Sequence, residues 1–397
     1  MNTPVERRGR LENGAELVAC PSPQLHSVAF SVVLPFTPEC TPGVYHLVEH
    51  MFFERAGERR AKEINAEMTA RGSEIMGYTA VNYMCFSFTC RPDVFLPQLE
   101  LLFSMLSQRD YEREDFERVL PVIRNEIFEA AFYDARSADI LRELWFDSRY
   151  IAPVLGNADV LSRLEPEEIR EARASLFNRG MCLFLAGAFT PEQERRVLDT
   201  FGKMPLRPRE RTPAPVEEKV TREVNRVGRG YELQVLVTYH VERADLELKL
   251  AAHWLRSGLF DGLDAAFFRF FDDRGFQFYS VDGIYNIRGD ELIFSYLVHI
   301  TKKERKKFDP LIDAFEDEAA HTDYISLVKP YLYENAPFLY DSPERLCSHY
   351  VDTWADLSAP LTLREELEYC QKFTNERLVA CWERIASSLR RIFYIGR

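Results

Sequence analysis

The sequence predicts an α+β fold built from two copies of one α+β unit. Three observations support this: the chain has 397 residues, more than one typical core holds; the order of strand and helix patterns in the first half recurs in the second; and a proline-rich run separates the halves. That run, 204–217, contains four prolines and no apolar periodicity, which indicates a semi-rigid linker. The predicted domains are therefore 1–203 and 218–397.

The first half alternates strand and helix signals. β-branched and aromatic runs bounded by turn residues indicate strands within 9–19, at 27–35, twice within 74–90 and at 181–187. Apolar residues three and four positions apart indicate helices at 44–54, 61–71, 93–107, 114–131, 137–150, 166–176 and 190–201. Pro42 and Gly43 break the chain just before the helix at 44–54.

The second half shows the same kinds of signal. Strands are expected at 233–240, 276–287, 292–300 and 391–395. Helices are expected at 246–271, 302–320, 342–357 and 362–390.

Charge and composition exclude several classes of protein. A net charge of −13 disfavours nucleic acid and anionic membranes as partners and favours basic peptides. The N-terminal residues lack a secretory signal, and no uncharged apolar run reaches the roughly 18 residues of a membrane span. The eight cysteines form no CxxC pair and are expected to be buried free thiols. These features predict a cytoplasmic enzyme.

The strongest chemical motif is His46-Leu47-Val48-Glu49-His50. It has the H-x-x-E-H form, an inverted version of the H-E-x-x-H zinc motif, and lies on a predicted helix. Histidines four positions apart share one helical face, so both imidazoles can reach one metal ion. Glu49 lies beside them, where it can act as the catalytic base.

A third metal ligand is expected at Glu126. A catalytic zinc has three protein ligands and an open position for water. Glu126 lies in the middle of a predicted helix between apolar neighbours, where an unpaired carboxylate would be costly. The set His46, His50 and Glu126 therefore predicts one Zn²⁺ per chain and peptide-bond hydrolysis with Glu49 as base.

At these residues the chain resembles the pitrilysin and insulinase family of zinc metallopeptidases, the inverzincins. It is most similar to the short two-domain type, such as the mitochondrial processing peptidase subunits. The similar segments are 11–14, 43–53, 61–64, 71–74 and 78–79. Glu126 falls 76 positions after His50, where that family has its third zinc ligand. Pro153, Gly156 and the strand ending at 185–187 match later landmarks.

The resemblance implies two homologous domains that face each other and enclose peptides in a chamber. It also implies that substrate adds as a strand to an edge near the zinc, which here involves Gly77, Tyr78 and Thr79.

Three departures from the family pattern bear on activity. Val119 stands where a second acidic residue is usual, and Met76-Gly77 replaces a usual Asn-Ala. Phe271 and Phe278 stand where self-sufficient members have an Arg and a Tyr that bind substrate. Arg274 and Tyr279 lie nearby and are candidates for those auxiliary roles.

Two interpretations follow. The favoured one is a zinc-dependent endopeptidase that forms the zinc-bearing subunit of a heterodimer, with a homologous partner supplying the Arg and Tyr and with a homodimer as the alternative. Peptide maturation or leader removal would suit such an enzyme. The interpretation from a different class is a non-catalytic scaffold or binding subunit of a peptidase complex.

Overall fold

The computed structural model describes residues 4–36, 41–80, 82–132, 154–206, 231–262, 264–288, 290–357 and 359–396. The chain divides into two compact units. The first unit comprises Met1–Lys219, Phe338–Thr353 and Pro360–Thr362, and the second comprises Val220–Pro337, Trp354–Ala359 and Leu363–Arg397. Most of the predicted linker, the predicted helix at 137–150 and Pro153 lie outside the described residues.

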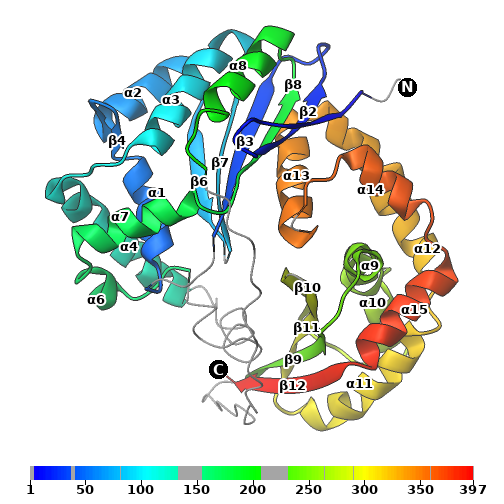
Figure 1. Ribbon diagram of the computed structural model, residues 1–397. Coiled ribbons are helices and arrows are strands. Elements are labelled where there is room, and N and C mark those ends of the chain that lie inside the picture. The colour runs from blue at the N-terminus through cyan, green and yellow to red at the C-terminus, as the bar shows by residue number, and fades with distance from the viewer. Residues whose placement is uncertain are drawn as a thin grey trace. The chain divides into compact units, whose positions relative to one another are not determined.

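A six-stranded sheet forms the centre of the first unit (Figure 1). Its strands, in chain order, are β1 (Arg7–Arg10), β2 (Glu16–Pro21), β3 (Val28–Pro35), β6 (Ile75–Thr79), β7 (Tyr83–Cys90) and β8 (Cys182–Gly187). The spatial order is β1-β2-β8-β3-β7-β6, and only β2 and β8 pair in parallel. Strand β6 therefore forms one edge of the sheet.

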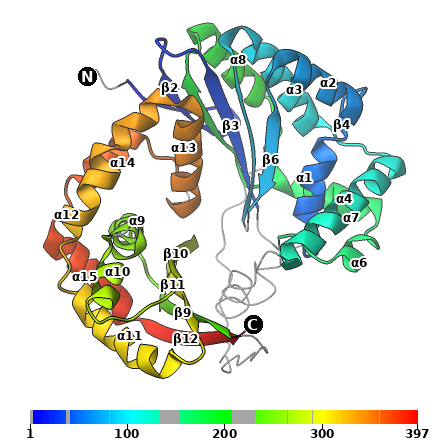
Figure 2. The same ribbon diagram turned by 180° about the vertical axis from the view of Figure 1, so that it is seen from behind.

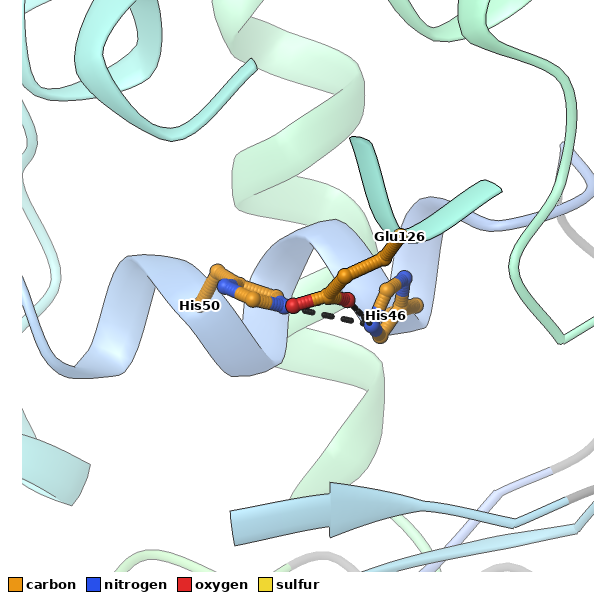
Figure 3. Close-up of side chains that lie close together, drawn as sticks. All are labelled: His46, His50 and Glu126. Carbon is orange, nitrogen blue, oxygen red and sulfur yellow. Dashed lines mark hydrogen bonds and ion pairs between the residues drawn. The ribbon is translucent and has the colours of Figure 1, made fainter. Parts of the chain in front are cut away.

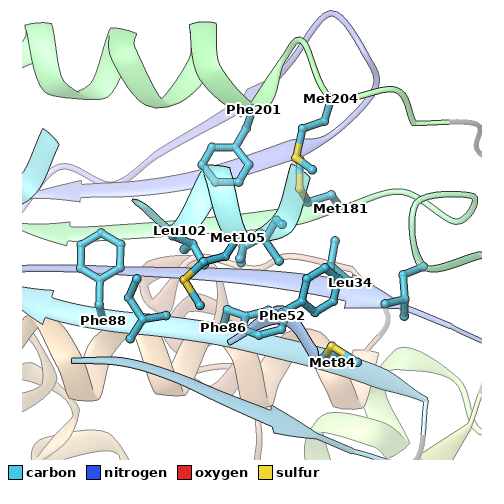
Figure 4. Packing of buried hydrophobic residues seen from close by; sticks show 14 of the residues in the cluster. Leu34, Phe52, Met84, Phe86, Phe88, Leu102, Met105, Met181, Phe201 and Met204 are labelled. Atoms are coloured by element: carbon cyan, nitrogen blue, oxygen red, sulfur yellow. The ribbon is translucent and has the colours of Figure 1, made fainter. Parts of the chain in front are cut away.

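Helices cover one face of this sheet (Figure 1). They are α1 (Val44–Phe52), α2 (Ala61–Arg71), α3 (Phe95–Ser107), α4 (Arg113–Phe132), α6 (Ala158–Leu161), α7 (Pro166–Leu176) and α8 (Pro191–Phe201), with a 3-10 turn at Pro92–Val94 and a small hairpin of β4 (Arg55–Ala56) and β5 (Arg59–Arg60). Large apolar side chains fill the layer between helices and sheet, among them Phe52, Phe86, Leu102 and Phe201 (Figure 4). This core fixes α1 against the strands.

A helix from late in the sequence covers the opposite face of the same sheet. Helix α13 (Pro343–Leu357), orange in Figures 1 and 2, lies beside the strands in both views, and its residues up to Thr353 belong to the first unit. The buried Tyr350 ring stacks on Phe184 with 5.8 Å between centroids. The Cys347 thiol donates to the Ala29 carbonyl at 3.6 Å. The inner strands β2, β8, β3 and β7 are therefore covered on both faces, which explains their almost continuously apolar sequences.

Two glycines fix the start of α1. Gly43 and Gly156 both have positive φ, 83° and 72°, which side chains rarely adopt. A Cβ on Gly43 would lie 2.6 Å from the Gly156 Cα, so each glycine leaves room for the other. The loop at 154–157 can therefore press directly on the turn that leads into the metal-binding motif.

The second unit has a four-stranded antiparallel sheet of order β10-β11-β9-β12. Its strands are β9 (Glu232–Val241), β10 (Ser280–Arg288), β11 (Glu291–Thr301) and β12 (Leu389–Gly396). Its helices are α9 (Leu246–Phe260), α10 (Ala266–Asp272), α11 (Arg305–Ala319), α12 (Tyr324–Val328), α14 (Leu363–Cys370) and α15 (Asn375–Ala386), with a π-helical turn at Lys329–Glu334 and a 3-10 turn at Ala336–Asp341.

Two predicted helices of this half are each split in two. The predicted helix at 246–271 breaks because Gly262 takes a positive φ of 83°, which ends α9 and starts a turn before α10. The predicted helix at 362–390 breaks before Thr374, whose hydroxyl accepts from the Arg377 N–H and caps α15. None of the helices in the described ranges is long and apolar enough to span a bilayer.

Tyr350 offers a test of the α13 contact. Tyr350→Ala removes a fully buried ring and is expected to lower the free energy of unfolding by about 3 kcal/mol. Tyr350→Phe loses only the hydroxyl that donates to Glu6 and is expected to cost about 1 kcal/mol. Urea unfolding followed by circular dichroism measures both changes. Tyr231→Ala, at an exposed tyrosine, is the control; equal values for Tyr350→Ala and this control would contradict the packing role.

Candidate metal centre

Helix α1 carries three of the four predicted site residues. His46 and His50 lie one turn apart on the same face, and Glu49 lies between them in sequence. His46 and Glu49 are buried, whereas 20% of the His50 side chain is exposed. The helix is apolar on its remaining faces, where Leu47, Val48, Met51 and Phe52 pack into the core.

Helix α4 brings Glu126 to the same place. Near its start the fully buried Asp115 carboxylate accepts from the Arg55 guanidinium and from the Glu112 N–H. Val119 and Ile123 pack into the core. Glu126 follows Val119 by seven positions, two helical turns, so it projects from the same side toward α1.

The three predicted ligand atoms lie very close together (Figure 3). The Nε2 atoms of His46 and His50 are 3.2 Å apart. The Glu126 Oε2 atom is 3.1 Å from the first and 3.3 Å from the second. A tetrahedral zinc with ligand distances of about 2.0–2.1 Å requires about 3.3–3.4 Å between ligand atoms. The observed triangle therefore has the size of one face of such a tetrahedron.

The electrostatics of the site favour a neutral imidazole at His46. Burial, and then the nearby His50, lower the pKa of His46 to about 4. The neutral form is the one that binds a metal ion. The Nδ1 atom of His46 is buried and has no hydrogen-bond partner in the described part of the chain.

Glu49 is held by the edge strand. The Thr79 hydroxyl donates to Glu49 Oε2 at 2.6 Å. Burial raises the pKa of Glu49, and so does Glu126, while the bond from Thr79 and the nearby His50 act in the opposite direction. A carboxylate with a raised pKa beside a metal site is suited to accepting and returning a proton near neutral pH.

Of the predicted substrate-binding residues, only Thr79 makes a hydrogen bond to this cluster. Gly77 lies directly against the rings of Phe53 and Phe86. A Cβ at this position would lie 3.0 Å from atoms of both rings. Tyr78 points to the other face of the strand and is 43% exposed. The contact between Thr79 and Glu49 was missed from the sequence, since residues thirty positions apart show no local pattern that would reveal it.

No acidic side chain stands at position 119, where the resemblance leads one to expect it. Val119 is buried in the apolar core. Glu117 is mostly exposed and pairs with Arg113, whose Nε donates to its Oε1 at 2.9 Å.

The auxiliary candidates of the second unit are differently engaged. Arg274 donates to the Phe270 carbonyl at 3.0 Å and lies over the Phe270 ring at 3.6 Å. Its guanidinium therefore packs against the C-terminal end of α10. Tyr279 is 91% exposed. Phe271 and Phe278 are part of an aromatic core and pack against each other with 5.8 Å between centroids.

The second unit repeats one packing detail of the site without its ligands. Gly283 on the edge strand β10 packs under Phe260 as Gly77 packs under Phe53. His253 precedes Phe260 by seven positions, as His46 precedes Phe53, but Arg256 and Ser257 then stand in the places of Glu49 and His50. In the described ranges, His46, His50 and Glu126 are the one group of three that could hold a metal ion.

Part of the chain is similar to known zinc proteases. Residues 36–147 match the family model described as insulinase (peptidase family M16). The chain is 24% identical over 175 residues to an uncharacterized zinc protease, YmxG, of Bacillus subtilis, which covers 42% of each protein. It is 27% identical over 174 residues to the uncharacterized zinc protease SCO5738 of Streptomyces coelicolor, covering 41% of this chain and 37% of that one. The match thus spans less than half of either relative.

Solved structures share the fold over the full chain. A protease from Helicobacter pylori is similar with a TM-score of 0.77 and 12% identity, covering all of both chains. A putative M16-like peptidase from Alicyclobacillus acidocaldarius has a TM-score of 0.76 and 16% identity, covering 100% of this chain and 99% of that chain. An M16 inactive domain from Pseudomonas fluorescens has a TM-score of 0.78 and 13% identity, covering 100% and 98%.

These likenesses confirm the predicted α+β class. The segment 36–147, which contains His46, Glu49, His50 and Glu126, is therefore similar to the insulinase family, peptidase family M16.

Proposed function

We propose that this chain is a zinc-dependent endopeptidase whose zinc is bound by His46, His50 and Glu126. The observation that carries the proposal is the triangle of ligand atoms, with sides of 3.1, 3.2 and 3.3 Å. Three protein ligands on one tetrahedral face leave a fourth position for water or substrate, as in catalytic rather than structural zinc sites. Two uncharacterized zinc proteases among the relatives support the choice of metal and reaction.

Each side chain has a distinct task in this proposal. Bound zinc would lower the pKa of water and polarise the peptide carbonyl. Glu49 accepts the proton of the attacking water and delivers it to the leaving amine, so no covalent intermediate with the protein is needed. Thr79 holds one oxygen of Glu49 at 2.6 Å and leaves the other for the reacting groups.

The unpaired edge of β6 is the proposed substrate-binding element. Among the described strands β6 pairs only with β7, and Thr79 at its end touches the base. An extended peptide added to this edge would place its backbone beside Glu49. Gly77, Tyr78 and Thr79 would then provide the main-chain hydrogen bonds.

A partner subunit remains part of the proposal. Phe271 and Phe278 are committed to an aromatic core, and Arg274 is bound to its own helix, so these contacts favour an Arg and a Tyr from a second chain over Arg274 and Tyr279. A homologous heterodimer is proposed first and a homodimer second.

A cytoplasmic location and a role in peptide maturation or leader removal are also proposed. The buried cysteines, none in a disulfide in the described residues, suit a reducing compartment.

Glu49→Gln tests the base. The variant is expected to keep zinc but to lose at least about a hundredfold in kcat/KM, because an amide cannot accept the proton. Zinc content by atomic absorption and cleavage of a quenched peptide library measure the two effects, with the chain alone and with any co-purifying partner. Glu58→Gln, at an exposed position, is the control. Full activity of Glu49→Gln would contradict the assigned role.

Glu126→Gln tests the third ligand. Loss of this carboxylate is expected to weaken zinc binding by about a hundredfold or more, since only two ligands remain on one helix. Competition with a chromogenic chelator measures the zinc dissociation constant, and Glu129→Gln on the exposed side of α4 is the matched control.

Removal of zinc from the unchanged protein should abolish cleavage, and added zinc should restore it. A protein without zinc or cleavage under every condition would support the scaffold interpretation instead.

The pKa of His46 gives a pH prediction for the metal-free protein. Because its pKa is lowered to about 4, the ring should stay neutral as the pH falls from 7.5 to about 5, and zinc should displace no proton from it in that range. The ring-proton resonance of His46, assigned with a His46→Gln variant, should keep its chemical shift over this range. A midpoint near the ordinary value of about 6.5 would contradict the prediction.

A further inference from the structure

Two large apolar side chains lie exposed on the edge strand beside Glu49. Met76 is 64% exposed and Tyr78 is 43% exposed. Because they are two positions apart in β6, both point to the same face of the sheet. The Tyr78 ring lies edge-on against the buried Tyr83 ring, with 5.9 Å between centroids and 3.4 Å between the hydroxyl oxygens, so Tyr78 is held in one orientation.

The other face of β6 offers no comparable side chain. Ile75 is buried, Gly77 has no side chain and lies under Phe53 and Phe86, and the Thr79 hydroxyl is bonded to Glu49. Any selection of side chains by this strand must therefore come from Met76 and Tyr78.

The neighbouring strand does not shield these two residues. In register, Met76 is opposite Ser87 and Tyr78 is opposite Cys85, both small side chains. Edge strands are usually protected by charged residues or proline, and β6 contains neither. An exposed apolar edge without such protection is suited to receiving another strand.

We propose that Met76 and Tyr78 determine sequence specificity. The substrate class is extended peptides with apolar or aromatic side chains at two positions, two residues apart and on one side of the cleaved bond. In an added strand, alternate side chains share a face, and those directly opposite lie about 4.5–5.5 Å away between Cβ atoms. Thr79 marks the position of Glu49 at the end of β6, so both Met76 and Tyr78 fall to the same side of it.

The peptide residue between these two positions points to the face of the metal ligands and is not selected by β6. Residues on the far side of the cleaved bond pass beyond the end of the strand. The inference rests on the proposed function, because it assumes that the peptide on β6 is the substrate.

The test uses Met76→Thr and Tyr78→Thr, which remove apolar surface and keep a side chain that favours strands. Peptide libraries randomised at each position are cleaved by the full-length protein, and the products are sequenced. The unchanged protein should prefer apolar residues at two positions spaced by two. In each variant, the apolar preference should fall by about two- to fivefold at one position and stay unchanged at the other. Leu246→Ala, an exposed apolar residue in the second unit, should change neither preference.

A second measurement separates this inference from the proposed function. Zinc-loaded Glu49→Gln protein, with and without each threonine substitution, is titrated with uncleaved library peptides, and affinity is measured by fluorescence anisotropy. If the Glu49→Gln protein binds peptides with the apolar preference but the unchanged protein cleaves none, the result would support the specificity and contradict the peptidase activity. Cleavage without preference at two spaced positions, or preferences that survive both threonine variants, would overturn the inference alone.

Discussion

The contact of one carboxylate with two imidazoles is the interaction on which the candidate metal centre depends. Glu126 must reach from α4 to α1, and its oxygen lies 3.1 and 3.3 Å from the two ring nitrogens. These distances allow either a hydrogen bond from an imidazole N–H to the carboxylate or a cation shared by the three atoms, and both require that α1 and α4 are held in place. The Gly43–Gly156 contact holds the start of α1, and the buried Asp115 with Arg55 anchors the start of α4.

The same architecture joins the base to the edge of the sheet. Glu49 is buried on α1, and the hydrogen bond that it accepts comes from the last residue of β6. A peptide paired with that strand would therefore lie beside the base through main-chain geometry alone, before any side chain is recognised. In the proposed peptidase, main-chain pairing would set the position of the peptide, and the side chains of β6 would set the preferred sequence.

Much of the site could be predicted from the sequence, because helical periodicity alone places His46, Glu49 and His50 on one turn. Glu126 was predicted from its mid-helix position and from its spacing in the resembling family. Burial does not explain it, because 40% of its side chain is exposed. Strand and helix positions in the first half were likewise readable from local patterns. The contact of Thr79 with Glu49 and the engagement of Arg274 with its own helix were not, since both depend on tertiary packing. The breaks at Gly262 and Thr374 were also missed, because apolar periodicity continues across them.

The membership of α13 in the first unit was the least predictable feature. Apolar strands indicate that both faces of the sheet are covered, but they do not indicate which segment, here more than 150 residues away, covers the second face. Its consequence lies in the order of synthesis. As the chain leaves the ribosome, α1 and all six strands emerge long before Tyr350, so one apolar face of the sheet stays uncovered until α13 has been made. Until most of the protein has been made, the nascent first unit therefore exposes apolar strand surface of the kind that promotes aggregation.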